Sequence, residues 1–174
     1  MRLIFESHAT SLDNEANLAS GHFDVDLSPL GLKQAGQLGE RYRDHDLTAI
    51  YCSDLRRAYR TAEIAFPKAS VIRDARLREC DYGRLTRHPV KEVEEWKLRC
   101  IDSPFPGGES YRQAAQRVAS LLAELPADGE FLLIGHRAVY YALEHLLRGA
   151  ELRAIVAAPW HWQPGWVFEV PGQD

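Results

Sequence analysis

Two histidines give the first indication of chemistry in this sequence. His8 and His136 each follow a short apolar segment, at residues 3–6 and 131–135, although they lie far apart in the chain. A neutral imidazole can act as a nucleophile, a general base or a hydrogen-bond donor near neutral pH. If both segments are parallel strands of one sheet, their carboxyl ends bring the two histidines to the same crevice. A lone histidine after a strand is more often structural, so this interpretation needs support from other motifs.

An arginine pair follows a third apolar segment. Residues 47–52 are mostly apolar, and Ser53-Asp54-Leu55-Arg56-Arg57-Ala58 begins a helical pattern directly after them. Free amide groups and guanidinium groups at a helix start favour anions such as phosphate. The alternative is that both arginines are solvated on a helix face. The motif therefore indicates an anion site only in combination with the histidines.

A carboxylic acid and a glycine-rich turn complete the set of candidate residues. Glu79 lies in Leu77-Arg78-Glu79-Cys80-Asp81-Tyr82-Gly83, where a partly buried carboxyl group can protonate a leaving group. Taken alone, Glu79 would be an ordinary surface acid. The turn Pro106-Gly107-Gly108-Glu109-Ser110 is explained by a tight turn and a helix cap, and nothing in its residue types demands catalysis.

Strands and helices that would position these residues alternate along the chain. Short apolar runs bounded by polar residues predict strands at residues 3–6, 47–52, 131–135 and 167–170, the last at an edge. Apolar residues at three- and four-residue steps predict helices at residues 32–43, 55–66, 111–125 and 139–147. Capping signals precede three helices, at Ser28-Pro29, Ser53-Asp54 and Glu109-Ser110. This alternation predicts an α/β fold, a three-layer α/β/α sandwich around a mostly parallel central sheet.

The length of 174 residues is near the usual size of one domain, so we expect a single domain over residues 1–174. Residues 81–106 are less regular, with one glycine and several prolines around a short charged helix at residues 90–98. We expect this segment to form an excursion over the rim of the sheet.

Composition excludes several classes of protein. With 45% hydrophobic residues, 26% charged residues and a net charge of −4, the chain is neither a disordered tail nor a basic nucleic-acid binder. No apolar stretch is long enough to cross a bilayer, and the N-terminus lacks a signal-peptide core, so we expect a cytoplasmic protein without a membrane partner. The odd cysteine number and the absence of Cys-x-x-Cys spacing favour reduced thiols at Cys52, Cys80 and Cys100 over disulfides or a zinc site.

Taken in order, these motifs resemble the histidine phosphatase (phosphoglycerate mutase-like) superfamily from Ile4 to about Leu147. That family begins with a strand and Arg-His-Gly, then Thr or Ser, then Asn, and the matching run here is residues 7–14, Ser-His-Ala-Thr-Ser-Leu-Asp-Asn. The remaining matches follow in family order: Ser20-Gly21, Asp24, Leu27-Ser28, Gly31, Gln34-Ala35, the Arg57 motif, Glu79 with Gly83, residues 106–110 and Gly135-His136. Each match alone is weak, but the ordered series is specific.

The resemblance implies a mechanism. His8 would attack phosphorus and form a phosphohistidine, while Glu79 protonates the departing oxygen and then activates water. Arg57 and His136 would stabilise the phosphoryl oxygens. The implied activity is hydrolysis of a small phosphorylated metabolite without a metal ion or cofactor. Further residues match positions that lie by the phosphate or at the pocket mouth: Asn14, Ser20, Gly21 and Tyr82.

Ser7 is the main departure from the family pattern, because the family places an arginine immediately before the nucleophilic histidine. One positive charge is therefore missing next to the phosphate. Two arginines are candidates to replace it: Arg137 directly follows His136, and Arg84 directly follows Gly83. A smaller departure is Ala9 in place of glycine, which requires only that the backbone there avoids a positive φ.

Several alternatives remain open at this stage. A phosphoglycerate mutase must protect phosphohistidine from water, usually with extra segments over the site, and this chain is short there. A phosphate-binding or regulatory protein that has lost catalysis is a second alternative. A metal hydrolase built on His22, Asp24 and Asp26 is a third, although their spacing alone does not define a site. The sequence identifies neither the substrate nor whether the chain forms a homodimer.

Overall fold

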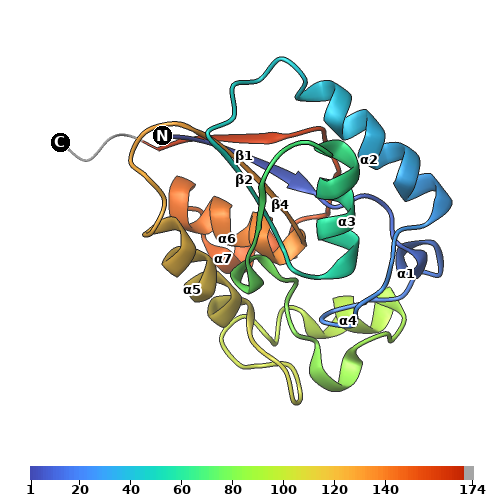
Figure 1. The fold of residues 1–174 in the computed structure, drawn as a ribbon. Coiled ribbons are helices and arrows are strands. Elements are labelled where there is room, and N and C mark those ends of the chain that lie inside the picture. Colours follow the sequence, from blue (N-terminus) through green and yellow to red (C-terminus); the bar gives the residue numbers. More distant parts are fainter. Residues whose placement is uncertain (171–174) are drawn as a thin grey trace.

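A computed structural model describes residues 1–170 of the chain. Within them, five strands form one sheet in the order β3-β2-β4-β1-β5 (Figure 1). The strands are β1 (Arg2–Ser7), β2 (Ala49–Cys52), β3 (Val71–Arg73), β4 (Glu130–Gly135) and β5 (Trp166–Glu169). Neighbours β3, β2, β4 and β1 run parallel, and β5 pairs antiparallel with β1. The mostly parallel sheet predicted from the sequence is confirmed.

The two central strands are buried on both faces, which explains their nearly continuous apolar sequences. Residues 3–5 of β1 and residues 131–134 of β4 are at most 2% exposed. The register pairs Ser7 with Gly135 at the carboxyl ends of these strands. The residues that follow, His8 and His136, therefore leave the sheet side by side.

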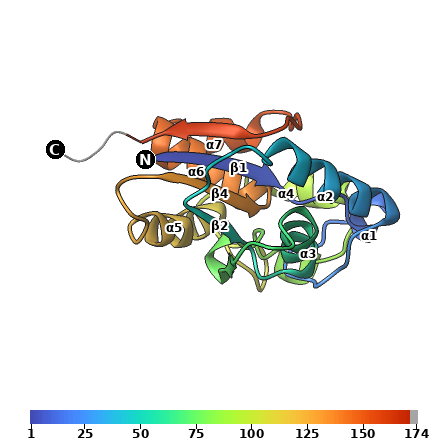
Figure 2. The same cartoon turned by 45° about the horizontal axis from the view of Figure 1, so that its top comes forward.

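Helices cover both faces of the sheet, as Figures 1 and 2 show. The α-helices are α1 (Leu12–Glu15), α2 (Pro29–Arg41), α3 (Arg56–Ala65), α4 (Val90–Trp96), α5 (Tyr111–Leu122), α6 (Arg137–Arg148) and α7 (Leu152–Ala157). One apolar cluster joins α5 and α6 to the face of the sheet that carries Leu3 and Phe5. A second cluster joins α2 and α3 to the face that carries Ile4 and Ile50. These two clusters establish the predicted α/β/α layers.

Two of the three predicted helix caps are confirmed. Ser28 accepts a hydrogen bond from the Gly31 amide at the start of α2, and Ser110 forms a capping box with Gln113 at the start of α5. The predicted cap at Ser53-Asp54 is wrong, because the N-cap residue of α3 is Leu55. The Arg56 amide instead donates to Asp24 Oδ1 at 2.6 Å, from a loop far away in sequence.

Other predicted boundaries differ by a few residues, and one strand and two α-helices were not predicted. The four predicted strands and the helix at residues 90–98 are all present with shifted ends. Strand β3 and helices α1 and α7 are only three to six residues long, so they carry too little periodicity to be recognised. The three cysteines are free and buried, and no helix in residues 1–170 could cross a membrane.

The segment at residues 81–106 contains α4 and the short 3-10 helix η2 (Gly83–Leu85). It packs tightly against the turn before α5, because a Cβ atom on Gly83 would lie 2.3 Å from the Pro106 carbonyl oxygen. Gly83 also has a φ of +52°, which other residues rarely adopt. Figure 1 places α4 beyond the end at which β1 terminates.

Candidate active site

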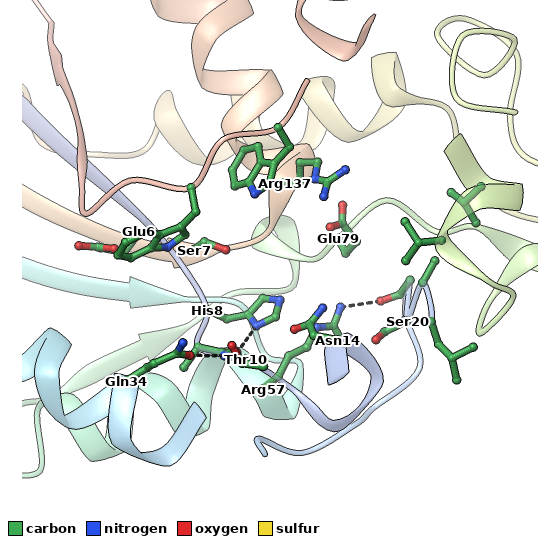
Figure 3. Close-up of a pocket in the computed structure, with 18 of the residues that line it drawn as sticks. Glu6, Ser7, His8, Thr10, Asn14, Ser20, Gln34, Arg57, Glu79 and Arg137 are labelled. Atoms are coloured by element: carbon green, nitrogen blue, oxygen red, sulfur yellow. Dashed lines mark hydrogen bonds between the residues drawn. The ribbon is translucent and has the colours of Figure 1, made fainter. Parts of the chain in front are cut away.

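A cavity of about 600 Å³ lies where β1 ends, between α2, the segment that carries α4, and the residues that precede β5 (Figure 3). Its lining includes most of the residues singled out in the sequence: Ser7, His8, Asn14, Ser20, Gly21, Arg57, Glu79, Tyr82 and Arg137. The fold thus brings together residues from five separate segments. His136 lies directly beside His8, with their ring centroids 4.9 Å apart.

A backbone group of the next residue orients the His8 ring. Its Nδ1 lies 2.7 Å from the Ala9 carbonyl oxygen, an acceptor, so this nitrogen carries the proton and donates. The other nitrogen, Nε2, is then the one with a free lone pair. The Thr61 hydroxyl accepts from the Ala9 amide at 3.0 Å and fixes this turn. Burial, and secondarily the charge of Arg57, lowers the pKa of His8 to about 3, so its imidazole is neutral at physiological pH.

His136 is fully buried, and neither of its ring nitrogens has a hydrogen-bond partner within residues 1–170. Burial lowers its pKa well below the usual value, and the charge of Arg57 acts in the same direction. Buried polar atoms without partners are rare in folded proteins because each one costs free energy. Two such atoms beside His8 indicate a place where a bound group supplies the missing partner.

The Arg57 guanidinium is almost completely buried, with 2% of the residue exposed. Its NH1 donates to the Phe23 carbonyl at 3.0 Å, and its NH2 donates to the Gly21 carbonyl at 2.8 Å. Arg57 therefore supports the loop that forms the pocket mouth while placing a positive charge near both histidines.

Ser20, on the loop that Arg57 supports, is 7% exposed. Asn14 uses its side-chain oxygen to accept from the Ser11 amide at 2.9 Å.

The Glu79 carboxyl group is anchored through one oxygen only. Its Oε1 accepts from the Cys80 amide at 2.8 Å and from the Ala138 amide, in the first turn of α6, at 3.1 Å. Its Oε2 makes no hydrogen bond within the described part of the chain, and Glu79 lines the cavity. Beside it Tyr82 packs edge-on against Phe105, and burial raises its pKa well above the usual value.

The two arginines considered as replacements for the missing charge differ in position. Arg137 lines the cavity, donates from NH1 to Glu94 Oε1 at 2.8 Å and lies over the Trp160 ring at 5.2 Å. Arg84 is exposed and does not line the cavity. Its backbone amide donates to the Pro106 carbonyl.

Sequence reasoning missed one whole wall of the cavity. Lining residues that were not singled out include Glu6, Gln37, Arg41, Glu94, Trp160 and Trp162. Glu6 is fully buried, its Oε1 accepts from Arg41 NH2 at 2.9 Å and from Tyr42 OH at 2.8 Å, and its carboxyl group is turned away from His8 (Figure 3). The signal available in the sequence was a charged residue at the end of an otherwise apolar strand.

The family model described as the histidine phosphatase superfamily (branch 1) matches residues 3–163. The chain belongs to this superfamily. A relative from Klebsiella pneumoniae, "Probable phosphoglycerate mutase GpmB", is 34% identical over 193 aligned positions, covering 95% of this chain and 89% of the relative.

Solved histidine phosphatase structures resemble the whole fold. YhfR of Bacillus stearothermophilus superposes with a TM-score of 0.84 at 25% identity, covering 98% of this chain and 92% of that one. A mycobacterial glucosyl-3-phosphoglycerate phosphatase bound to VO3 superposes with a TM-score of 0.78 at 28% identity, covering 91% and 87%. These similarities confirm the predicted fold class.

At the two positions that depart from the pattern of the histidine phosphatase superfamily, Ser7 and Ala9, the backbone has no positive φ. The non-glycine residues with positive φ in residues 1–170 are Asn17 and Arg87, so Ala9 needs no strained conformation. Ser7 ends β1 in register with Gly135. The serine therefore leaves this position without the positive charge of the family's arginine, and it keeps its place in the strand register.

The three residues weighed for a metal hydrolase are used for other contacts. His22 Nε2 lies 2.8 Å from the Glu79 carbonyl oxygen, Asp24 caps the Arg56 amide, and Asp26 accepts from the Leu27 amide at 2.7 Å. No group of three or more potential metal-ligating side chains is present in the described residues.

Proposed function

We propose that the protein is a phosphomonoester hydrolase that works through a phosphohistidine at His8. The observation that carries this proposal is the pairing of a neutral His8, with its Nε2 free, and a His136 whose two buried nitrogens lack partners. A tetrahedral phosphoryl group bound at His8 would give His136 an acceptor for a donated N–H. Membership of the histidine phosphatase superfamily supports the same chemistry.

In the first step, His8 Nε2 attacks phosphorus while the bond from phosphorus to the ester oxygen breaks. The phosphoryl group passes to His8, and the leaving oxygen takes the proton of the Glu79 carboxyl group through the unanchored Oε2. Arg57 and His136 stabilise the charge on the phosphoryl oxygens as the transition state forms. These side chains are held rigidly by burial, so little reorganisation is needed.

In the second step, the Glu79 carboxylate takes a proton from water, and the resulting hydroxide oxygen attacks the phosphohistidine. The products are inorganic phosphate and neutral His8, with Glu79 protonated again. One carboxyl group serves as acid and then as base, because it faces the same reacting oxygen position in both steps.

The cavity favours a small phosphorylated metabolite as substrate. Its volume of about 600 Å³ is within the usual range for small-molecule sites, and its lining is rich in polar side chains. The relatives named above act, by their names, on phosphoglycerate compounds. We therefore propose phosphorylated organic acids and their glycosyl derivatives as the first substrates to screen.

Replacing His8 tests the proposal directly. Wild-type protein given a radiolabelled phosphodonor and quenched rapidly should carry an acid-labile, base-stable label, and His8→Ala should carry none. Turnover in His8→Ala should fall at least about 10³-fold, because the covalent route is lost. Full labelling of His8→Ala would contradict the nucleophile assignment, and its thermal unfolding serves as the folding control.

Metal independence is a separate part of the proposal. Arg57, His136 and the backbone amides near the helix starts supply the positive potential that a divalent ion would otherwise bring. Prolonged treatment with EDTA should therefore leave turnover within about twofold of the untreated rate. A large loss that magnesium or zinc restores would contradict this part and favour a metal-assisted mechanism.

A mutase is the second candidate, because the relative at 34% identity is named as a probable phosphoglycerate mutase. The two candidates differ in the acceptor of the phosphoryl group. Labelled phosphoenzyme should release inorganic phosphate to water at the rate of turnover. Transfer to added 2- or 3-phosphoglycerate that outpaces this release would favour the mutase.

An intact, folded protein that binds vanadate but never forms phosphoenzyme would favour a binding or regulatory role.

A further inference from the structure

The residues 106–110, Pro-Gly-Gly-Glu-Ser, do more in the structure than form a turn and a helix cap. Glu109, just before α5, and Arg117, on α5, form an ion pair with two hydrogen bonds. Arg117 NH2 donates to Glu109 Oε1 at 2.6 Å, and Arg117 Nε donates to Glu109 Oε2 at 3.2 Å. Each side chain is 18% exposed. The pair lies directly against the loop that carries Glu79.

Both partners of this ion pair also bind the main chain of the Glu79 loop. Arg117 NH1 donates to the Arg76 carbonyl at 2.6 Å, and NH2 donates to the Glu79 carbonyl at 2.9 Å. Glu109 Oε1 accepts from the Asp81 amide at 3.1 Å. The pair therefore holds the backbone before Glu79, at Glu79 and after it.

The two glycines of the turn make this contact possible. A Cβ atom on Gly108 would lie 2.1 Å from the Asp81 carbonyl oxygen and 2.7 Å from the Gly83 nitrogen, so only glycine fits there. Gly107 has a φ of +76°. The Glu109 amide then donates to the Asp81 carbonyl at 2.9 Å. The turn thus holds Glu109 against the Glu79 loop through backbone contacts, and the Glu109–Arg117 ion pair adds side-chain hydrogen bonds to the same loop.

The Glu79 loop depends on hydrogen bonds from side chains of other segments, because it is not part of a strand and makes no sheet hydrogen bonds. It runs between η1 (Ala75–Leu77) and η2, outside the sheet. Its Glu79 carbonyl oxygen accepts from the side chains of Arg117 and His22. A proton donor must stay within hydrogen-bond reach of the leaving oxygen, and a displacement of about 1 Å costs about 10²-fold in rate.

We infer that Glu109 and Arg117 are positioning residues for the proton donor Glu79, an inference that rests on the function proposed above. They act from outside the cavity, since neither lines it. Their loss should affect the step in which Glu79 gives its proton, while nucleophilic attack by His8 continues.

The test compares two substrates with different leaving groups in Arg117→Gln and Glu109→Gln. An alkyl phosphate needs protonation of its leaving oxygen, whereas p-nitrophenyl phosphate needs almost none. Each variant should lose about tenfold or more in kcat on the alkyl phosphate relative to the aryl phosphate, with KM for both substrates nearly unchanged. Arg112→Gln is the matched control, because Arg112 lies on the same helix and pairs with Asp102 rather than with the Glu79 loop.

A double variant distinguishes positioning from general loosening of the fold. In a Glu79→Gln background, adding Arg117→Gln should produce no further selective loss on the alkyl phosphate, because the proton donor is already gone. Equal losses on both substrates, or a selective loss that is undiminished in the Glu79→Gln background, would overturn the inference. If Arg117→Gln does not fold, Glu109→Gln and Arg117→Lys give the same comparison, with thermal unfolding measured alongside.

The outcome also separates this inference from the proposed function. A selective defect in Glu79→Gln without one in Arg117→Gln and Glu109→Gln would overturn the positioning role and leave Glu79 as the donor. A Glu79→Gln protein without selectivity would overturn the donor assignment and this inference together, while phosphoenzyme formation at His8 would still support the nucleophile.

Discussion

Two walls of the candidate active-site cavity are built in different ways. One wall carries His8 and Arg57, with the fully buried His136 directly beside His8, and these residues follow the ends of strands β1, β2 and β4. The other carries Glu79 and Arg137, in a loop and at the start of α6, and both are engaged in polar contacts at the rim. The first is fixed by the sheet, whereas the second is fixed by hydrogen bonds and ion pairs.

This difference separates two requirements of catalysis. The phosphoryl group is common to all substrates of a phosphatase, so its binding groups can be fixed in a preorganised setting. The leaving group varies, and the loops that face it can change without disturbing the sheet. Substitutions on the strand wall should therefore affect every substrate, and those on the loop wall should affect substrates selectively.

The strongest test of this comparison is Glu79→Gln. Glutamine keeps the shape and can still accept from the Cys80 and Ala138 amides, but it has no carboxyl proton to give. We expect kcat/KM to fall about 10²–10⁴-fold on alkyl phosphates and much less on p-nitrophenyl phosphate. Steady-state kinetics on both substrates check this. Equal losses would indicate a structural role or another acid such as Asp81.

Replacing Arg137 should have a smaller effect, on the affinity for phosphate analogues. We propose that it supplies the charge missing at Ser7, although it must leave Glu94 to do so. Arg137→Ala should weaken vanadate binding by about 1.5–3 kcal/mol, the scale of a charge-assisted hydrogen bond, and Ser7→Arg should partly restore it. Vanadate inhibition constants measure both effects.

Glu94→Gln and Arg41→Ala complete the Arg137 test. Glu94→Gln should strengthen vanadate binding, because it releases Arg137 from its ion pair. Arg41→Ala is the matched control, since Arg41 lines the cavity but pairs with Glu6. Unchanged vanadate affinity in Arg137→Ala would show that this arginine does not contribute, and a loss in Arg41→Ala alone would assign the charge to Arg41.

The smallest expected change concerns protonation of His8. A histidine whose folded-state pKa is about 3 stays neutral at every pH above that value, whereas an ordinary histidine gains its charge below about pH 6.5. Nitrogen NMR of the His8 ring should therefore show the neutral Nδ1–H tautomer from pH 8 down to pH 5. Protonation of the His8 ring near pH 6.5 would contradict the described environment.

The sheet and the residues beside it could be predicted because strong local patterns determine them. Apolar runs gave β1 and β4, and parallel pairing then placed His8 next to His136. Strand β3, with three residues, and the short helix α7 gave no such pattern. The cap of α3 was mispredicted for a related reason, since Asp24 reaches the Arg56 amide through tertiary contact.

Side-chain pairing across distant segments explains what the sequence could not show about the site. Nothing local links Arg117 to Glu79, or Glu94 to Arg137, because each contact joins segments that are far apart in the sequence. The cavity wall with Glu6 and Arg41 was missed for the same reason.

The pairing of Ser7 with Gly135 has a consequence for how this site can evolve. His8, the proposed nucleophile, is placed by the register in which β1 pairs with β4, and Ser7 occupies the last paired position of that register. A single residue inserted into β1 would exchange its two faces and displace His8, whereas substitution at Ser7 leaves the register intact. Changes in phosphate affinity are thus accessible by point mutation, and changes in nucleophile position are not.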